Sequence, residues 1–547
     1  MFESAELGHK IDKALWDKAM PKLRTDLLDA QFELGELGKF SEANKFPVII
    51  LINGLDAAGK GETVKLLNNW MDPRHIQNVA FPPPSDEERE RPFMWRFWRA
   101  LPPKGSIGIL FGNWYTDPVQ ERVAKRSKRA ELDSRLNEIN RFEEMLAQEG
   151  ALVLKFWFHI TEAMQKTRLK ALENDPDTRW RVTKTDWAAY KQYDEYRRVS
   201  EHVLRQTSTS NAPWIVVDGA DEHYRSLMVG NTLLGAIRQR LAIEKRAEQD
   251  IEKEKGGANE DVANPAAAMS KAKAKIAAEK VVEKVAKKAA ENSWDSRSHA
   301  APLPAALGDR DLINTLNMKL KLSKKLFESE LEKYQGNLAL LTRRAAFKNR
   351  SLIIVFEGND AAGKGGSIRR VTGAFDPRHI EVHPIAAPSE EERAQPYLWR
   401  FWRRIPRTGR VAIFDRSWYG RVLVERVEGF CAENDWMRAY TEINDFEDQL
   451  IADGAVVVKF WLAITPEEQL KRFKSREKTN FKRFKITPDD WRNRDKWNAY
   501  ERAVCDMIDR TSTENAPWTL VEANDKYYAR IKVLKTICET LDRALKD

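Results

Sequence analysis

Two glycine-rich segments of the chain have the residue spacing of a phosphate-binding loop. Residues 54–61 (GLDAAGKG) and 358–365 (GNDAAGKG) both match Gly-x4-Gly-Lys, and each follows a short apolar run. In such loops backbone amides cradle phosphate oxygens and the lysine neutralises their charge. An ordinary strand-to-helix turn is the alternative, and two matches in the same context favour the loop. In the second segment the predicted phosphate or nucleotide ligands are Gly358, Asn359, Ala361, Ala362, Gly363, Gly365 and Gly366, with Lys364 as the cation.

An acid inside each loop predicts a bound cation. Asp360, like Asp56 in the first segment, would repel a phosphate at close range unless a cation lies between them. The hydroxyl residue that usually ligates magnesium after the lysine is a glycine in both segments. We therefore expect Mg²⁺ to be bound, with the aspartate as a direct or water-mediated ligand.

A second acid follows the apolar run at residues 411–414. Asp415 would end a buried strand, with Arg416 and Arg421 beside it. Two acids, a metal, a lysine and arginines form a set that is suited to phosphoryl transfer. A helix-capping carboxylate is the alternative for Asp415, because aspartate is common at helix N-termini. The residues predicted to be catalytic are Asp360, Lys364, Asp415, Arg416 and Arg421, and the predicted metal ligands are Asp360 and Asp415.

The two segments belong to an internal repeat with an offset of 304 residues and no gap. The repeat also aligns residues 72–76 with 376–380 (DPRHI) and 95–99 with 399–403 (WRFWR). Three of the predicted catalytic residues have no counterpart in the first half: Asp415, Arg416 and Arg421 align with Phe111, Gly112 and Asp117. We therefore predict that the C-terminal half is catalytic and the N-terminal half degenerate, with weak phosphate binding left open where Asp56 and Lys60 remain.

The predicted elements that position these residues are buried strands alternating with helices. Apolar runs occur at residues 47–53, 352–356, 411–414, 455–461 and 518–521, and a helix is expected over 364–373. Continuous apolar strands separated by helices indicate a parallel sheet covered on both faces, with ligands at the carboxyl ends of the strands. The WRFWR segments are expected to pack in the core rather than to stack on bases. Residues 246–306, rich in Ala, Lys and Glu, are interpreted as a linker between domains at 1–245 and 307–547.

Composition limits the protein class and its partners. The chain has 547 residues, of which 42% are hydrophobic and 32% charged, which excludes collagen-like and low-complexity proteins. A net charge of +9 favours polyanionic partners such as nucleic acid, phosphate polymers or nucleotides. The three cysteines are expected to be reduced core thiols. No signal-like segment and no run of about 18 apolar residues occurs, so we expect a cytoplasmic protein without a membrane partner.

Taken together, these motifs resemble the polyphosphate kinase 2 family. The resemblance is carried by residues 357–366, 414–419 (FDRSWY), 425–426, 484–489 (FKITPD) and 511–518. Two fused copies resemble its class II subgroup. The resemblance implies tandem P-loop kinase-like α/β/α domains with a helical lid, inorganic polyphosphate as donor, AMP converted to ADP, Mg²⁺ as cofactor and no nucleic-acid partner.

Roles for individual residues follow from the same resemblance. It implies that Asp360 and Asp415 hold magnesium and position the acceptor phosphate, that Lys364, Arg416 and Arg421 bind phosphate oxygens, and that Glu425 lies near the nucleotide. In the lid it implies four candidates for binding the polyphosphate chain or for closing over the transferring group: Arg472, Arg476, Arg483 and Lys485. A solvated helix face is the alternative for these four bases. Gly420 and Phe484 depart from the residues that many relatives have there.

The expected reaction is transfer of the terminal phosphoryl group of polyphosphate to AMP by the C-terminal half. One alternative is a nucleoside monophosphate kinase that uses ATP. Another is a non-catalytic polyphosphate-binding or nucleic-acid-binding protein, against which the set of Asp360, Lys364, Asp415 and Arg416 argues. The N-terminal half is expected to act as a scaffold, and association of copies of the chain is left open.

Overall fold

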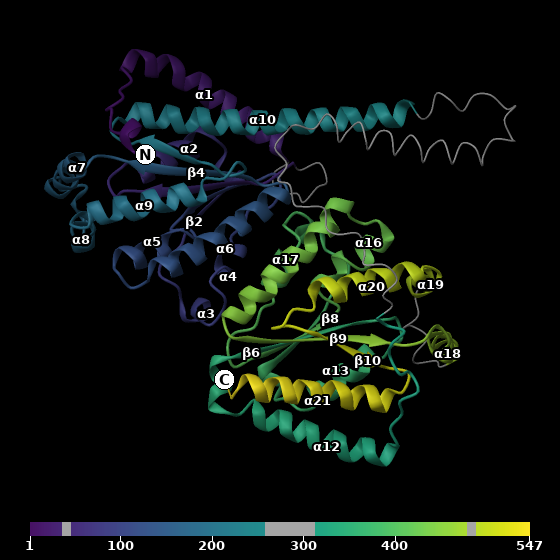
Figure 1. Cartoon of the computed structure of the whole chain (residues 1–547). Helices are drawn as coiled ribbons and strands as arrows, with labels where there is room; N and C mark the ends of the chain where they lie inside the picture. The colour runs from purple at the N-terminus through teal and green to yellow at the C-terminus, as the bar shows by residue number, and fades with distance from the viewer. Residues whose placement is uncertain (36–44, 258–311, 479–487, 547) are drawn as a thin grey trace, which may run out of the picture. The chain divides into compact units, whose positions relative to one another are not determined.

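The computed structural model describes residues 1–35, 45–257, 312–478 and 488–546 (Figure 1). The chain divides into two compact units, which are described separately. Unit 1 takes in Met1–Phe81 and Pro102–Pro304, and unit 2 takes in Pro82–Leu101 and Ala305–Asp547. The predicted linker at 246–306 lies largely outside the described residues. The part of it that is described continues a helix to Gly257. The predicted domain limits of 1–245 and 307–547 stay a prediction.

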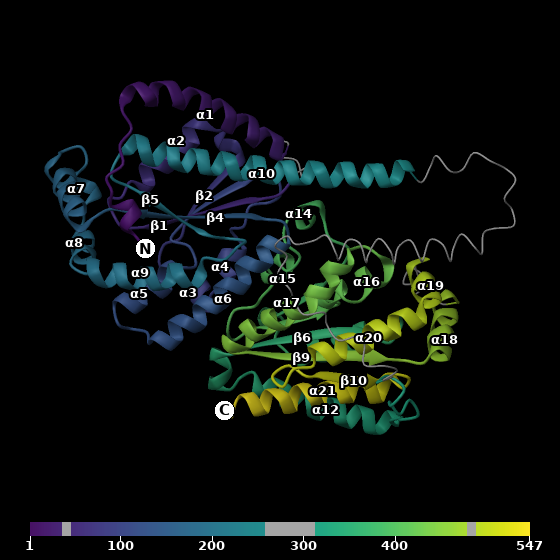
Figure 2. The same cartoon turned by 45° about the horizontal axis from the view of Figure 1, so that its top comes forward.

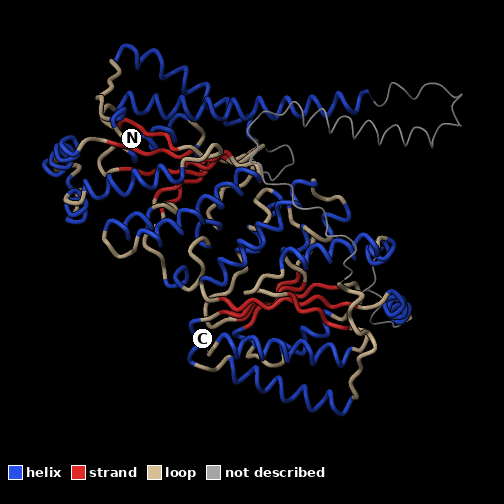
Figure 3. Tube along the Cα trace, in the orientation of Figure 1, coloured by secondary structure: helices blue, strands red, loops and turns tan. Residues whose placement is uncertain are grey.

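Unit 1 contains a five-stranded parallel sheet in the order β2-β3-β1-β4-β5. Its strands are β1 (Val48–Gly54), β2 (Ile76–Ala80), β3 (Ile107–Phe111), β4 (Leu152–His159) and β5 (Trp214–Asp218). Its longer helices are α1 (Lys13–Leu34), α2 (Lys60–Trp70), α5 (Thr116–Val123), α6 (Arg129–Gln148), α7 (Glu162–Asn174), α8 (Lys184–Tyr190), α9 (Tyr193–Thr207) and α10 (Glu222–Gly257). Helices α1, α2 and α10 cover one face of the sheet, and α5, α6 and α9 the other (Figures 1 and 3).

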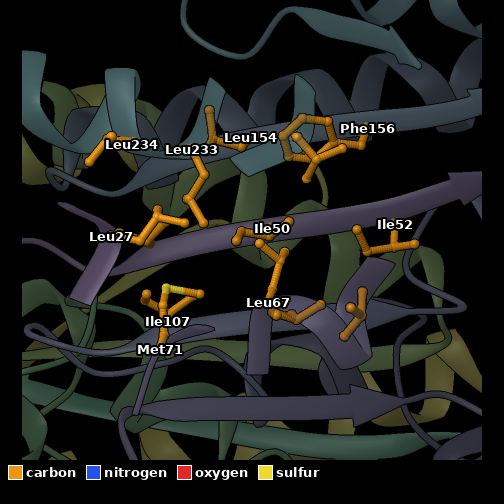
Figure 4. Close-up of a cluster of buried hydrophobic side chains, with 14 of the residues drawn as sticks. Leu27, Ile50, Ile52, Leu67, Met71, Ile107, Leu154, Phe156, Leu233 and Leu234 are labelled. Atoms are coloured by element: carbon orange, nitrogen blue, oxygen red, sulfur yellow. The ribbon is translucent and has the colours of Figure 1, made fainter. Parts of the chain in front are cut away.

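The core of unit 1 lies between the sheet and its first helical layer. Strand β1 is buried along its whole length because it lies between β3 and β4 and has helices on both faces. Its Ile50 belongs to one cluster of buried side chains with Leu67 of α2, Leu233 of α10 and Phe156 of β4 (Figure 4). A continuous apolar strand is thus stable here because both faces of the sheet are covered.

Unit 2 repeats this architecture in the order β10-β9-β6-β8-β7. Its strands are β6 (Ser351–Gly358), β7 (Ile380–Pro384), β8 (Val411–Asp415), β9 (Ala455–Ala463) and β10 (Trp518–Glu522). Its longer helices are α12 (Lys324–Leu341), α13 (Lys364–Thr372), α17 (Glu433–Ala452), α18 (Pro466–Glu477), α19 (Pro488–Asp495), α20 (Trp497–Thr511) and α21 (Lys526–Ala544). Short helices are α3 (Asp86–Arg89), α4 (Trp95–Trp98), α14 (Glu390–Arg393), α15 (Trp399–Trp402) and α16 (Val424–Glu428). Figure 2 shows α18 and α19 at the edge where β9 and β10 end.

In each unit a buried lysine on the central sheet bonds to the helices that cover one face of the sheet. In unit 2, Nζ of Lys459 on β9 lies 2.7 Å from a carboxylate oxygen of Glu447 and 2.9 Å from the hydroxyl of Tyr419, and it donates to the carbonyl oxygen of Thr511 at 2.7 Å. Burial lowers the pKa of Lys459, while the Glu447 carboxylate opposes the shift. The hydrogen bonds satisfy a charge that would otherwise be costly to bury.

The strands and helix predicted from apolar runs are confirmed. The edge strands β2 and β7 were not predicted, because they are short and largely exposed, with polar residues interspersed. Trp399 and Trp402 are buried, which confirms core packing of the WRFWR segment, and within unit 2 the ring of Trp402 stacks on Trp98 at 5.6 Å.

All three cysteines are free, but only Cys538 is fully buried, so the expectation of three core thiols is wrong for Cys431 and Cys505. Among the described residues no helix has the length and apolar character needed to span a membrane.

Candidate active site

The phosphate loop of unit 2 joins β6 to α13 at the carboxyl edge of the sheet. Gly358 ends β6 with φ +144°, and a Cβ there would lie 2.4 Å from the carbonyl oxygen of Leu462, so only glycine fits. Gly363 caps α13 in the left-handed conformation, and Lys364 begins the helix with its Nζ 2.6 Å from the carbonyl oxygen of Gly358. The other predicted ligands, Asn359, Ala361, Ala362, Gly365 and Gly366, lie in the loop or the first turn of the helix. The loop therefore presents backbone amides, a helix N-terminus and an ammonium group to an anion.

The two predicted metal ligands lie at the ends of neighbouring strands. Asp415 is the last residue of β8 and is in register with Phe356 of β6, and Asp360 follows the end of β6. Nη2 of Arg416 lies 3.4 Å from Oδ1 of Asp360. The side chain of Asp360 is 13% exposed, whereas that of Arg416 is 56% exposed. The site thus places a largely buried acid beside an arginine that solvent, or a ligand, can reach.

Arg416 has an unusual backbone conformation. Its φ of 65° lies in the left-handed region, which residues with a Cβ rarely adopt, and the aligned Gly112 in unit 1 has φ 63°. Such a conformation costs on the order of 1–3 kcal/mol for a non-glycine residue and is found most often at functional sites. Unit 2 therefore carries a strained arginine at a position where the same backbone holds glycine in unit 1.

A buried carboxyl group lies behind the loop. Glu357 of β6 accepts a hydrogen bond from the hydroxyl of Ser417 at 2.8 Å. Burial raises the pKa of Glu357, and the charges of Lys364 and Arg416 oppose that shift. In unit 1 the aligned pair is Asn53 and Asn113, whose amides are hydrogen-bonded at 3.2 Å. The contact survives in both units, but only unit 2 makes it with an acid.

Arg421 and Glu425 form an ion pair at 2.9 Å, so the structure brings these two predicted residues together. The guanidinium of Arg421 also lies 4.1 Å from the ring centre of Tyr397, whose hydroxyl accepts a hydrogen bond from the Arg421 backbone and donates one to the carbonyl oxygen of Trp418. Gly420 has no positive φ, and a Cβ there would make only ordinary contact with Tyr397, so steric conflict does not explain its departure from relatives.

The described lid residues differ in their surroundings. Arg472 of α18 donates to the carbonyl oxygens of Ala361 and Ala523 at 2.9 and 2.8 Å, so it braces the loop from the protein side. Arg168 makes the corresponding bond to Ala57 in unit 1. Contact of Arg472 with polyphosphate stays a prediction. Burial lowers the pKa of Arg476, and Asp490 and Asp360 oppose that shift, which associates Arg476 electrostatically with the acid of the loop. Arg483, Lys485 and the departing residue Phe484 lie outside the described residues.

Asn493, which was not predicted from the sequence, holds the other oxygen of Asp360. Nδ2 of Asn493 on α19 donates to Oδ2 of Asp360 at 2.8 Å, and the carbonyl oxygen of Asn493 accepts from the hydroxyl of Tyr500. The repeat contained a signal for Asn493, because it aligns with Ala189 in the first half. Asn493 occurs only in the half of the repeat that also has the complete set of acids and arginines, which makes it a candidate for the site.

The two acids fit a hard divalent cation. Asp360 and Asp415 offer carboxylate oxygens from neighbouring strand ends, and within the described ranges no cluster of three or more His, Cys, Asp or Glu could form a closed metal site. Mg²⁺ is commonly held by one or two carboxylates, with water and substrate phosphates completing its coordination. The donor set therefore suits a metal that binds together with a phosphate ligand.

The loop of unit 1 keeps its shape but not its surroundings. Nζ of Lys60 lies 3.2 Å from Oδ1 of Asp56, and the side chain of Asp56 is 47% exposed. Lysine and acid therefore neutralise each other. At the carboxyl end of β4, Nε2 of His159 lies 2.8 Å from a carboxylate oxygen of Glu6, and the ring of Phe2 stacks on His159 at 4.5 Å. The first residues of the chain thus cover part of the edge at which a ligand would bind.

Comparisons with known proteins agree with the motifs. The family model described as Polyphosphate kinase 2 (PPK2) matches residues 19–245 and 321–547. The chain is 53% identical over 546 residues to the polyphosphate:AMP phosphotransferase of Pseudomonas aeruginosa, covering 100% of this chain and 99% of that protein. It is 36% identical over 527 residues to the polyphosphate:AMP phosphotransferase of Acinetobacter johnsonii, covering 95% and 96%.

A solved structure supports the same assignment. The crystal structure of a putative polyphosphate kinase 2 from Pseudomonas aeruginosa PA01 matches with a TM-score of 0.82 and 50% identity, and the match covers 100% of both chains. The predicted α/β fold with two tandem domains is confirmed by this likeness and by the two parallel sheets. The family predicted from the motifs is likewise confirmed, and the chain belongs to the polyphosphate kinase 2 family.

Proposed function

We propose that the chain transfers the terminal phosphoryl group of inorganic polyphosphate to AMP, giving ADP, at the site in unit 2. The observation that carries the proposal is the contact of Arg416 with Asp360 beside a complete phosphate loop. The relatives that match over nearly the whole length are named polyphosphate:AMP phosphotransferases, which supplies the donor and the acceptor. In the reaction the bond between the last phosphorus and its bridging oxygen breaks, and a bond to an oxygen of the AMP phosphate forms.

The protein's part is to position the reactants and to neutralise charge. The transition state of phosphoryl transfer is loose, so its equatorial oxygens carry the charge that must be stabilised. In this proposal Lys364 and the loop amides bind these oxygens, together with Arg416, which follows the end of β8. Arg421 binds the acceptor phosphate, and its contacts with Glu425 and Tyr397, which orient it, support that role. Bound Mg²⁺, held by Asp360 and Asp415, would supply further neutralisation of phosphate charge.

Unit 1 is proposed to act as a scaffold without catalysis of its own. Its loop pairs Lys60 with Asp56, and Phe111 stands where Asp415 ends the strand in unit 2. The covered edge at His159 supports the same role. The two units therefore share a fold but not a reaction.

The test is an ADP-formation assay with the full chain, AMP, polyphosphate and Mg²⁺, in parallel with ATP as the donor. We expect ADP to form from AMP when polyphosphate is the donor. If ADP forms with ATP but not with polyphosphate, the protein is an ordinary nucleoside monophosphate kinase. Asp415→Asn should lower kcat by about 10²-fold or more, as expected when a preorganised electrostatic group is lost. The matched control is Asp56→Asn, which should leave kcat within about 2-fold because a surface substitution away from the site has little effect. Equal losses from both variants would contradict the assignment to unit 2.

A further inference from the structure

A buried acid outside the phosphate loop holds three side chains from the lid side of unit 2. Glu428, at the end of α16, has a side chain that is 3% exposed. Its carboxylate lies 3.0 Å from Nε of Arg492 and 2.9 Å from Nζ of Lys496, and it accepts from the hydroxyl of Tyr500 at 3.3 Å. A buried carboxylate needs partners of this kind, so the contacts fix the junction of α19 and α20 on α16.

The contacts continue from Tyr500 to Asp360, the acid of the phosphate loop. The Tyr500 hydroxyl also lies 3.2 Å from Oδ1 of Asn493, and Nδ2 of Asn493 donates to Oδ2 of Asp360 at 2.8 Å. Because a carboxylate can only accept, the amide of Asn493 must point its nitrogen at Asp360 and its oxygen at Tyr500. Burial, together with Glu428, raises the pKa of Tyr500, so its hydroxyl keeps the proton that these acceptors share. The result is a polar path from Glu428 to Asp360.

The first half of the repeat lacks this path. Glu428, Arg492, Asn493 and Lys496 align with Ala124, Ala188, Ala189 and Gln192, and only the tyrosine is kept, as Tyr196. In unit 1 the loop acid pairs with the lysine of the same loop, and Oδ1 of Asp56 lies 3.2 Å from Nζ of Lys60. In unit 2 both oxygens of Asp360 have other partners, Arg416 and Asn493. Nζ of Lys364 bonds to the carbonyl oxygen of Gly358 at 2.6 Å, as Lys60 does to that of Gly54, so the lysines differ chiefly in their contact with the loop acid. The loop acid therefore pairs with the lysine in the unit that lacks the path, and with Arg416 and Asn493 in the unit that has it.

We propose that Asn493 is a positioning residue for phosphoryl transfer. Together with Arg416 it holds the Asp360 carboxylate away from Lys364. Glu428 in turn fixes the position of Asn493, through its contacts with Tyr500, Arg492 and Lys496. The proposal rests on the proposed function for its kinetic consequence. With Asp360 held, Lys364 keeps its charge for a phosphate oxygen. Without that restraint the two would pair, as they do in unit 1, and the loop would lose both a cation and a correctly placed acid.

The first experiment replaces Asn493 in the full chain. Asn493→Ala, the residue of the first half, should lower kcat by about 10- to 100-fold, the range seen when a hydrogen-bonded partner of a site ligand is removed. The KM values for AMP and polyphosphate should stay within about 3-fold of the parent, and the melting temperature should not change, because Asn493 is partly exposed. Asn493→Asp keeps the shape but loses the donor, so it should be no more active than Asn493→Ala. Unchanged kcat in either variant would overturn the proposal.

A second measurement does not depend on turnover. A crystal structure of Asn493→Ala should show the carboxylate of the loop acid moved toward Lys364, in the arrangement of Asp56 and Lys60. If Asp360 does not move, the positioning role of Asn493 is contradicted, even if the enzyme uses another phosphoryl donor or another nucleotide as acceptor. If the parent chain forms no ADP from polyphosphate, the proposed function fails, while this structural result still decides the inference. Ala189→Asn in unit 1 is the matched control and should leave kcat unchanged.

The connection to Glu428 is tested by a double-mutant cycle. Glu428→Gln removes the charge that holds Arg492 and Lys496, and it should reduce kcat less than Asn493→Ala does. Residues that act through one another are not additive, so the double variant should be about as active as Asn493→Ala alone. Fully additive losses, with both single variants still folded by their melting temperatures, would show that Glu428 does not act through Asn493.

Discussion

Units 1 and 2 share interactions that support the fold but differ in the residues of the candidate site. The lysine on the central sheet bonds to a glutamate at 2.7 Å in both, as Lys155 with Glu143 and as Lys459 with Glu447. A glutamine bonds the backbone of the loop acid at 3.1 Å in both, from Gln165 and from Gln469. These contacts hold the sheet, the helices and the loop backbone in place. Their persistence where the acids and arginines are lost shows that the fold's requirements are separable from those of the site.

The backbone turn after β8 gives the sharpest contrast between the units. Arg416 and Gly112 share a left-handed conformation that only the glycine adopts without strain. We expect Arg416→Gly to lower kcat by about 10³-fold or more, as for an arginine that stabilises the transferring phosphoryl group. The same change should raise the stability of the folded protein, or leave it unchanged, because strain of about 1 kcal/mol or more is relieved. Activity assays and chemical denaturation measure the two effects.

The control for Arg416 is the reverse comparison in unit 1. Gly112→Ala adds a Cβ 2.7 Å from the carbonyl oxygen of Phe81 and should destabilise the protein without lowering kcat directly. If Arg416→Gly retains full activity, the arginine is not part of the site. If it instead destabilises the protein, the backbone of unit 2 does not carry the strain that its φ indicates.

The buried lysines should behave alike in the two units. Lys459→Met leaves Glu447 buried without its cation, and Lys155→Met does the same to Glu143. Removing one partner of a buried pair destabilises a protein by about 3–5 kcal/mol. We expect losses of that size in both units, measured as a lower denaturation midpoint, with kcat per folded molecule unchanged. A large loss in one unit alone would mean that the shared contact supports the two sheets differently.

Tyr397 distinguishes the two halves of the repeat at the candidate acceptor site. Tyr397→Phe introduces the residue that the first half of the repeat has at the aligned position, Phe93. It leaves the Arg421 backbone N–H and the Trp418 carbonyl without the hydroxyl, which should destabilise the protein by about 1–3 kcal/mol. Because Arg421 and Glu425 are then less constrained, KM for AMP should rise more than KM for polyphosphate. Equal changes in both KM values would place Arg421 away from the acceptor.

The sequence was sufficient for the parts of this comparison that depend on local pattern. Strand β6 and the loop after it are visible because an apolar run meets Gly358 and Lys364 in a fixed spacing. The loss of Asp415 in the first half is visible because the repeat has no gap. Asn493 was not predicted, because it lies 133 residues from Asp360 in the chain and only the packing of α19 brings the two together. The backbone contacts of Arg472 were hidden for the same reason, since nothing in a helical base indicates which carbonyl groups it will meet.

The stability of the protein at acid pH should depend on one histidine in each unit. Burial lowers the pKa of His159 in unit 1, although Glu6 opposes that shift, and burial also lowers the pKa of His383 in unit 2. The unfolded chain, with histidine pKa values near 6.5, therefore binds protons that the folded chain does not, so stability falls as the pH drops below about 6.5. Each histidine can contribute a slope of up to about 1.4 kcal/mol per pH unit. Replacing His159 by alanine, the residue at the aligned position 463, should remove its share of that slope and leave the share of His383. Denaturation of the parent and the variant between pH 7.5 and 5 measures the difference, and parallel slopes would show that His159 takes up its proton in the folded state as readily as in the unfolded one.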